Sequence, residues 1–89
     1  MKPLLAGNWK MHGSSSSAKV LACRLAELNT TSMGIDLVVF PPSVHSHIVS
    51  AEIAGSCLEL GAQNMSEHAS GAFTGEISGE MLREIGCNY

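Results

Sequence analysis

The chain has 89 residues, of which 45% are apolar and 15% are charged, and its formal net charge is −3. This composition is typical of a globular domain, and the absence of a Lys/Arg cluster excludes a basic arm that binds nucleic acid. The apolar runs are short, as in residues 37–40, whereas a transmembrane helix needs about 20 apolar residues.

Cysteine usage and the N-terminal residues suggest a compartment. Cys23, Cys57 and Cys87 are odd in number, widely spaced and form no C-x-x-C pair. This pattern argues against a disulfide framework and against a zinc site. The N-terminal residues lack the long apolar segment of a secretory signal. We therefore expect a cytoplasmic protein with no metal site and no membrane segment.

The first elements are a strand and a helix. Residues 4–7 start an apolar stretch that continues to residue 10 and predicts the first strand. The serines at 14–17 are residues that cap helix N-termini. Over residues 18–28, Leu21, Leu25 and Leu28 recur at steps of four and three, so we expect a helix with these leucines on one face. Residues 29–32 are expected to end it, because their side chains compete for backbone hydrogen bonds.

A second strand and helix follow. Residues 35–40 are rich in β-branched side chains and predict a strand that the prolines at 41 and 42 terminate. Val44, Ile48 and Ala51 share one face of a predicted second helix, which Gly55 closes. Two histidines of this helix, His45 and His47, are two residues apart and face different sides, so we expect solvated side chains rather than a metal pair.

The remaining residues predict a third unit and the start of a fourth. Residues 58–62 predict a strand, and residues 65–75 a long polar loop of the kind that often carries function. Apolar residues between 77 and 85 predict a third helix, closed by Gly86. Residues 87–89 are expected to open a fourth strand. The alternation predicts an α/β fold with parallel strands and right-handed crossover helices, and leaves open whether the sheet closes into a barrel.

Polar residues at the carboxyl ends of the strands are the candidates for chemistry, because ligands bind there in α/β folds. Asn8 and Lys10 are two apart, so on a continuing strand both side chains face one side and Trp9 the other. An amide beside an ammonium group suits a phosphate or an enolate. The alternative is that Lys10 is a solvated charge and Asn8 a turn residue. A second polar pair, at 63–64, follows the third strand.

Four segments resemble the triosephosphate isomerase family, in the family's order and with similar spacing. They are residues 7–11 (GNWKM), 40–43 (FPPS), 61–64 (GAQN) and 71–76 (GAFTGE). The resemblance implies a (β/α)₈ TIM barrel, which takes about 250 residues. Residues 1–89 are then an incomplete single domain, namely the first three βα units and the start of the fourth strand.

The resemblance implies an isomerase of glycolysis and gluconeogenesis. It interconverts D-glyceraldehyde 3-phosphate and dihydroxyacetone phosphate, with a small phosphorylated triose as substrate and no cofactor or metal. By this resemblance Lys10 is a catalytic and substrate-binding residue, and Asn8 is a substrate-binding residue beside it.

The resemblance also implies a homodimer. The loop at 65–75 resembles the arm with which one subunit reaches towards its partner's active site. Dimer-interface roles then fall on residues in and before this arm, with Thr74 at or near its tip and Glu76 anchoring it through an ion pair: Gln63, Asn64, Phe73, Thr74 and Glu76.

The family's histidine electrophile and glutamate base lie beyond the point that matches Tyr89. Because a positioned acid or base contributes about 10²–10⁴ in rate, we expect residues 1–89 alone to be inactive. The alternative is a non-catalytic barrel fragment that acts as an interaction or assembly piece, or, less closely, an unrelated open α/β phosphate-binding domain. In an incomplete barrel the barrel-facing sides of Leu5, Val38 and Leu60, or of their neighbours, would be exposed to water. The isolated chain should then be oligomeric or partly molten.

Overall fold

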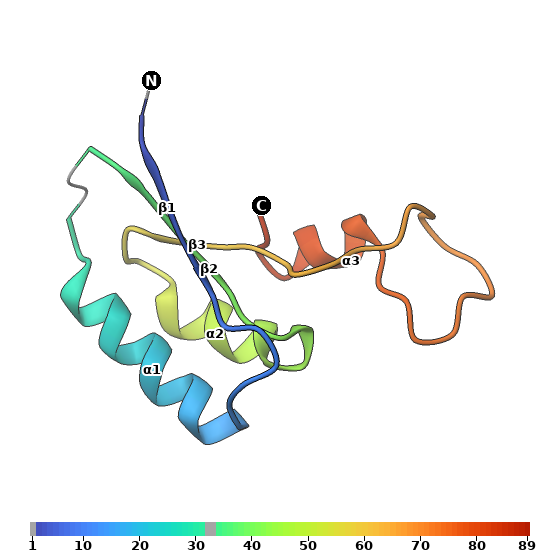
Figure 1. Cartoon of the computed structure of the whole chain (residues 1–89), viewed down its shortest axis with the longest axis horizontal. Helices are drawn as coiled ribbons and strands as arrows, with labels where there is room; N and C mark the ends of the chain where they lie inside the picture. The colour runs from blue at the N-terminus through green and yellow to red at the C-terminus, as the bar shows by residue number, and fades with distance from the viewer. Residues whose placement is uncertain (1, 32–33) are drawn as a thin grey trace.

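A computed structural model of the chain describes residues 2–31 and 34–89. Strands and helices alternate along it, as expected (Figure 1). The elements are β1 (Leu4–Asn8), α1 (Ser15–Leu28), β2 (Asp36–Phe40), the 3₁₀ turn η1 (Ser43–His45), α2 (Ser46–Ile53), β3 (Leu58–Leu60) and α3 (Gly79–Glu84). The strands form a parallel sheet in the order β1-β2-β3, which confirms the predicted parallel α/β architecture.

Helix α1 begins at a serine cap. The Oγ of Ser14 accepts a hydrogen bond from the Ser17 amide at 3.1 Å, and the Oγ of Ser17 accepts one from the Ser14 amide at 2.8 Å. This reciprocal pair satisfies two backbone donors that the helix start leaves unpaired. At the other end, the Asn29 side chain donates to the Leu25 carbonyl at 2.8 Å. Ser32, also expected to end this helix, lies outside the described residues.

The buried residues of α1 and α2 are mostly not those that the apolar periodicity marks. Helix α1 packs on α2 and buries Ala18 and Ala22. Of the three leucines, Leu25 is partly buried against the core, whereas Leu21 and Leu28 are 45% and 68% exposed. Small alanine side chains let the helices approach closely, so the alanine face turns inward. Helix α2 buries Val49 and Ile53 while Val44 and Ala51 are exposed. The tighter 3₁₀ turn before it changes the residue period and rotates the face away from the predicted one.

The expectation of exposed strand residues is confirmed for Leu5, whereas Val38 and Leu60 themselves are buried. Leu5, on the outer strand β1, is 62% exposed, but Val38 and Leu60 are only 1% and 2% exposed. Val38 lies on the central strand, between its partners in β1 and β3. Leu60 belongs to the core cluster, together with residues of all three helices: Ala18, Ala22, Val39, Val49, Ile53, Leu60, Leu82 and Cys87.

The residues after α3 join the free edge of β3, as predicted. Cys87 forms a parallel bridge with Leu60. The Asn88 amide donates to the Leu60 carbonyl at 2.9 Å, and the Ala62 amide donates to the Tyr89 carbonyl at 3.0 Å. These bonds follow the pattern of a parallel ladder, so the chain turns into strand geometry immediately after α3.

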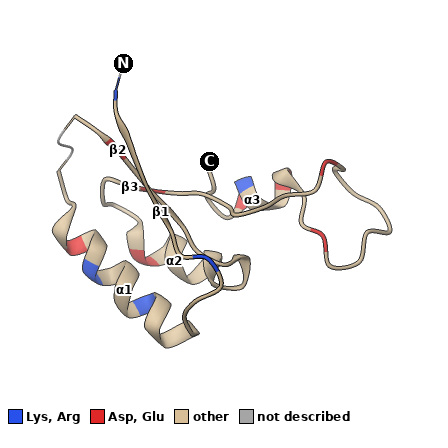
Figure 2. Ribbon diagram, viewed as in Figure 1, with Lys and Arg blue, Asp and Glu red and all other residues tan. Residues whose placement is uncertain are grey.

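The long segment between β3 and α3 is a loop that projects away from the sheet (Figure 1). Its two ends are joined by a bridge between Ser66 and Ser78 and by a 2.7 Å hydrogen bond from the Ser66 amide to the Ile77 carbonyl. We call residues 66–78 the arm. Helix α1 carries both basic and acidic residues, whereas the projecting loop carries acidic residues and no Lys or Arg (Figure 2). Within residues 2–31 and 34–89, no helix is both long and apolar enough to cross a membrane.

Candidate functional site

After the carboxyl end of β1 the chain forms a turn, which the side chain of the last strand residue stabilises. Strand β1 ends at Asn8, and Lys10 has a positive φ of 54°. The Lys10 amide donates a hydrogen bond to the Asn8 Oδ1 at 2.9 Å. Strand alternation therefore does not place Asn8 and Lys10 on a shared face, because the strand ends before Lys10. What joins the two residues is a side-chain hydrogen bond, as expected of an asparagine in a turn.

Gln63 connects this turn to the next two strands. Its Nε2 donates to the Lys10 carbonyl at 2.9 Å and to the Phe40 carbonyl at 2.8 Å. The Phe40 carbonyl also accepts from the Trp9 amide at 3.1 Å. The ends of β1 and β2 and the residues after β3 are thus bound together at one edge of the sheet. The sequence motifs predict only a dimer-interface role for Gln63 and do not predict this link, for which an amide just after a strand end is the available signal.

Next to this link, the backbone of Gly61 lies close to the ring of Phe40. A Cβ on Gly61 would lie only 2.5 Å from the Cδ1 of Phe40, so the Phe40 ring occupies the space that any larger residue would need. Only glycine lets the chain leave β3 so close to the end of β2. This approach brings Gln63 within reach of the Phe40 carbonyl.

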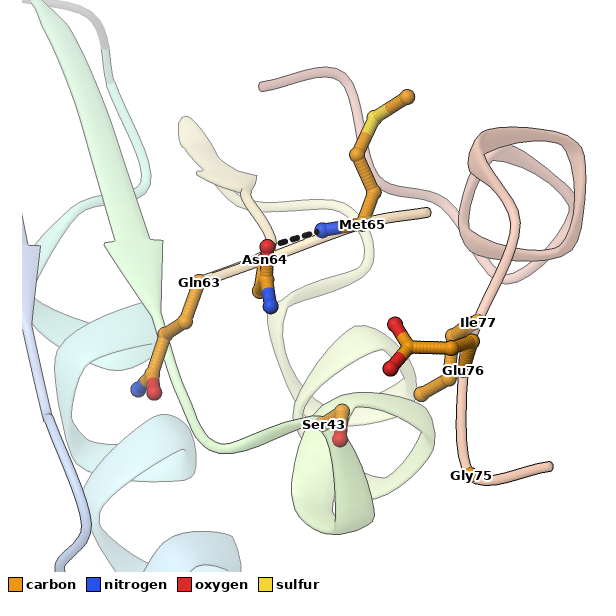
Figure 3. A pocket seen from close by; sticks show the side chains of 7 residues that line it. All are labelled: Ser43, Gln63, Asn64, Met65, Gly75, Glu76 and Ile77. Atoms are coloured by element: carbon orange, nitrogen blue, oxygen red, sulfur yellow. Dashed lines mark hydrogen bonds between the residues drawn. The ribbon is translucent and has the colours of Figure 1, made fainter. Parts of the chain in front are cut away.

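A small cavity lies between the segment after β3 and the C-terminal residues of the arm, 75–77. Its volume is about 180 Å³, and the Asn64 Oδ1 within it accepts from the Met65 amide at 2.9 Å. The Glu76 carboxylate points into this cavity (Figure 3). Within the described part of the chain Glu76 has no ion-pair partner, so the expected anchoring pair is not formed there. The lining residues are Ser43, Gln63, Asn64, Met65, Gly75, Glu76 and Ile77.

The arm presents two of the predicted interface residues to solvent. Phe73 and Thr74 are both exposed, and the Phe73 ring stacks on His68 with centroids 4.2 Å apart and planes 4° from parallel. The arm extends away from the sheet (Figure 1). The fold therefore gathers Asn8, Lys10 and Gln63 at the sheet edge and holds Thr74 apart from them.

His45 contradicts the prediction of a solvated side chain. It is only 7% exposed, and its Nε2 lies 3.3 Å from the Gly13 carbonyl oxygen. The 3₁₀ turn that follows the two prolines directs this ring inward, whereas His47 is exposed as predicted. No three His, Cys, Asp or Glu side chains gather as metal ligands would within the described ranges.

Parallel strands alternate with helices, and polar residues follow the carboxyl ends of the strands. A comparison with known families agrees with this architecture. A family model described as triosephosphate isomerase matches residues 3–89. The chain belongs to the triosephosphate isomerase family. The three parallel strands and their helices correspond to the first βα units of the family's TIM barrel.

Curated relatives support the same assignment. The triosephosphate isomerase of Acidithiobacillus ferrooxidans is 47% identical over 90 residues, which cover 100% of this chain and 35% of that protein. The one of Thiobacillus denitrificans is 49% identical over 99% of this chain and 34% of its own length. The one of Francisella philomiragia is 44% identical over 100% and 35%. The chain thus spans about a third of the length of the curated relatives it matches.

Proposed function

We propose that this chain supplies the N-terminal part of a triosephosphate isomerase, which interconverts D-glyceraldehyde 3-phosphate and dihydroxyacetone phosphate. One observation carries the proposal beyond family membership. Gln63 fixes the Lys10 carbonyl at 2.9 Å and so holds the lysine segment at the carboxyl edge of the sheet, where the active sites of TIM barrels lie.

In this proposal Lys10 is the catalytic residue of the segment. Its ammonium group binds the substrate phosphate and stabilises the negative charge that develops on the enediolate-like intermediate, as a fixed cation does at a developing oxyanion. Asn8 binds substrate and also holds the Lys10 amide through its Oδ1 at 2.9 Å. The reaction is a proton transfer that needs no cofactor or metal, in glycolysis and gluconeogenesis in the cytoplasm.

The arm is proposed to serve a homodimer. Gln63, Asn64, Phe73, Thr74 and Glu76 would contact a second subunit, with Thr74 reaching towards the partner's Lys10 segment. Three features support this role, since the arm projects from the sheet, its root is closed by the Ser66–Ser78 bridge, and it presents an exposed aromatic ring.

Residues 1–89 are proposed to be an incomplete single domain that is inactive by itself. They contain the lysine segment but none of the residues that the family uses as electrophile and base. The second candidate function, a non-catalytic assembly piece, is favoured by one observation. Strand β1 lies at an edge of the described sheet, and its Leu4 and Leu5 are exposed, which suits pairing with another strand.

A chimera tests the proposed function. Residues 1–89 replace the matched segment of the Acidithiobacillus ferrooxidans isomerase, and the turnover of glyceraldehyde 3-phosphate is measured. We expect an active chimera, in which Lys10→Ala lowers kcat by about 10²–10³-fold. The matched control is Lys19→Ala, a lysine whose side chain is 66% exposed on α1, and it should leave kcat unchanged.

Two outcomes would overturn the proposal. A folded but inactive chimera would contradict the assignment of function, and full activity in the Lys10→Ala chimera would contradict the role of Lys10. The chain of 89 residues, purified alone, should show no turnover. Turnover by that chain that Lys10→Ala abolishes would contradict its proposed inactivity.

A further inference from the structure

His45 is a buried polar side chain that the proposed function does not use. Its ring is 7% exposed and lies on η1, directly after β2. The Nε2 lies 3.3 Å from the Gly13 carbonyl oxygen, 32 residues away in the sequence. Because a carbonyl oxygen only accepts, Nε2 must carry the ring hydrogen and donate it. Within the described residues Nδ1 has no hydrogen-bond partner, so the bond to Gly13 is the one polar contact of the ring there.

Gly13 ends the short segment that carries Lys10. The segment leaves β1 after Asn8 and reaches Ser14, the N-cap of α1. Gly13 has a φ of 101°, a conformation that glycine adopts without steric cost. The bond from His45 therefore fixes the segment at its far end, immediately before the helix begins.

The near end of the same segment is fixed from β2 and β3. The Trp9 amide donates to the Phe40 carbonyl at 3.1 Å, and Gln63 donates to the Lys10 carbonyl at 2.9 Å. Residues 11 and 12 between the two anchors are exposed. The Lys10 segment is thus held by hydrogen bonds at both ends, to Phe40 and Gln63 at its start and to His45 at its end.

Lys10 itself needs such support. Its φ of 54° lies in the left-handed region, which is unfavourable for a residue with a Cβ and persists where the surrounding structure imposes it. A segment held at one end only could relax Lys10 into a commoner conformation. Any such relaxation would move the ammonium group, since the backbone direction sets where the side chain begins.

We propose that His45 is a positioning residue for Lys10, which acts through the Gly13 carbonyl to hold the lysine segment in its strained conformation. The proposal rests on the proposed isomerase function. It assigns a role to a side chain that touches neither substrate nor Lys10. The required chemistry is a neutral donor at the Nε2 position, so glutamine, whose amide nitrogen lies at a similar distance from Cα, should replace histidine.

The test uses three variants of the chimera described above. His45→Phe fills the buried space without a donor, His45→Gln restores a donor, and His47→Phe is the matched control on the exposed neighbour. We expect His45→Phe to lower kcat by about tenfold, because small misplacements of a catalytic group are costly in rate. The loss should fall mainly on kcat, since a charge that stabilises the transition state is displaced. His45→Gln should recover most of it, and His47→Phe should match the parent.

A second measurement needs no substitution. In the ¹⁵N spectrum of the parent chimera, the His45 Nε2 should be the protonated ring nitrogen, and its hydrogen should exchange slowly with solvent. An Nδ1-protonated ring would overturn the proposal even where His45→Phe fails to fold. So would a His45→Phe chimera with the kcat of the parent, or a His45→Gln chimera that is as slow as His45→Phe. An inactive parent chimera, in contrast, overturns the proposed function, and the catalytic purpose of the anchor falls with it.

Discussion

The side-chain amide of Gln63 faces two carbonyl oxygens from different strands, those of Lys10 and Phe40. Its neighbour Asn64 does the opposite, since its Oδ1 accepts from a backbone amide. Adjacent amides therefore have opposite hydrogen-bonding roles. Replacing each by the corresponding carboxylate separates those roles, because a carboxylate can accept but cannot donate at neutral pH.

We predict that Gln63→Glu destabilises the chimera by about 1–3 kcal/mol, because the Lys10 and Phe40 carbonyls both lose their donor and a hydrogen bond contributes about 0.5–1.5 kcal/mol. The effect is measured as the thermal midpoint, which shifts by about 2–4 °C per kcal/mol in a protein of this size. Asn64→Asp keeps its acceptor and should lower the midpoint less. Equal losses in the two variants would show that the donated bonds of Gln63 do not support the sheet edge.

Gly61 offers a second test at single-residue resolution. A Cβ there would lie 2.5 Å from the Phe40 Cδ1, whereas a Cβ on Gly7 would find its nearest atoms at 3.9 Å. Neither glycine has a positive φ. We therefore predict that Gly61→Ala costs about 1–3 kcal/mol of stability through overpacking, while Gly7→Ala, in a strand, is neutral or slightly stabilising. Thermal midpoints of the two chimeras provide the comparison, and a harmless Gly61→Ala would contradict it.

At the scale of elements, the order of strands and helices could be predicted from the sequence, but the helix faces could not. Apolar periodicity marks large side chains such as Leu21, whereas α1 packs through Ala18 and Ala22. Hydropathy gives alanine little weight, although its small size is what allows two helices to approach. Of the three leucines, Leu25 packs against the edge of the core, and the described residues leave Leu21 and Leu28 exposed.

This packing predicts a clear difference between two alanines. Ala22 on α1 is fully buried in the core, whereas Ala51 on α2 is exposed. Ala22→Leu should destabilise the chimera by about 1–3 kcal/mol, because the added methyl groups find no space. Ala51→Leu adds the same atoms where solvent surrounds the residue in the chain described here. The urea midpoint of each chimera measures the difference, and a tolerated Ala22→Leu would show that α1 does not pack through this face.

In the candidate site too, some features could be predicted from the sequence and others could not. Local spacing marked Asn8 and Lys10 at the end of the first strand, and family motifs supplied their expected roles. The bonds from Gln63 span 53 and 23 residues, and the bond from His45 spans 32. Such contacts depend on how the chain returns upon itself, and no local pattern of residue types encodes them. The left-handed φ of Lys10 was equally invisible, since nothing in its residue type requires it.

At the scale of the whole molecule, the sheet and its outer surface predict how the isolated chain behaves. Strand β1 lies at a sheet edge, and large apolar side chains on β1 and α1 are exposed, among them Leu4, Leu5, Val20 and Leu28. Unpaired edges and contiguous apolar surface both promote association.

We predict that the purified chain of 89 residues sediments as species larger than its 9.3 kDa monomer. Where monomer is present, its urea transition should be broad, as for a partly molten state. The chimera, which completes the barrel, should unfold sharply under the same conditions. A monomeric chain with a sharp transition would contradict the prediction and would mean that the first units form an independent folding domain.

Because the arm is closed at its root, changes in the arm need not alter the sheet. Because Ser66 and Ser78 are bridged where the arm leaves the body, the residues between them form a loop whose length is independent of the sheet. Insertions or a proteolytic nick at the arm's outer turn would leave the strand ladder and the lysine segment untouched. Within one chain, the Ser66–Ser78 bridge therefore uncouples the length of the arm from the geometry of the sheet and of the lysine segment.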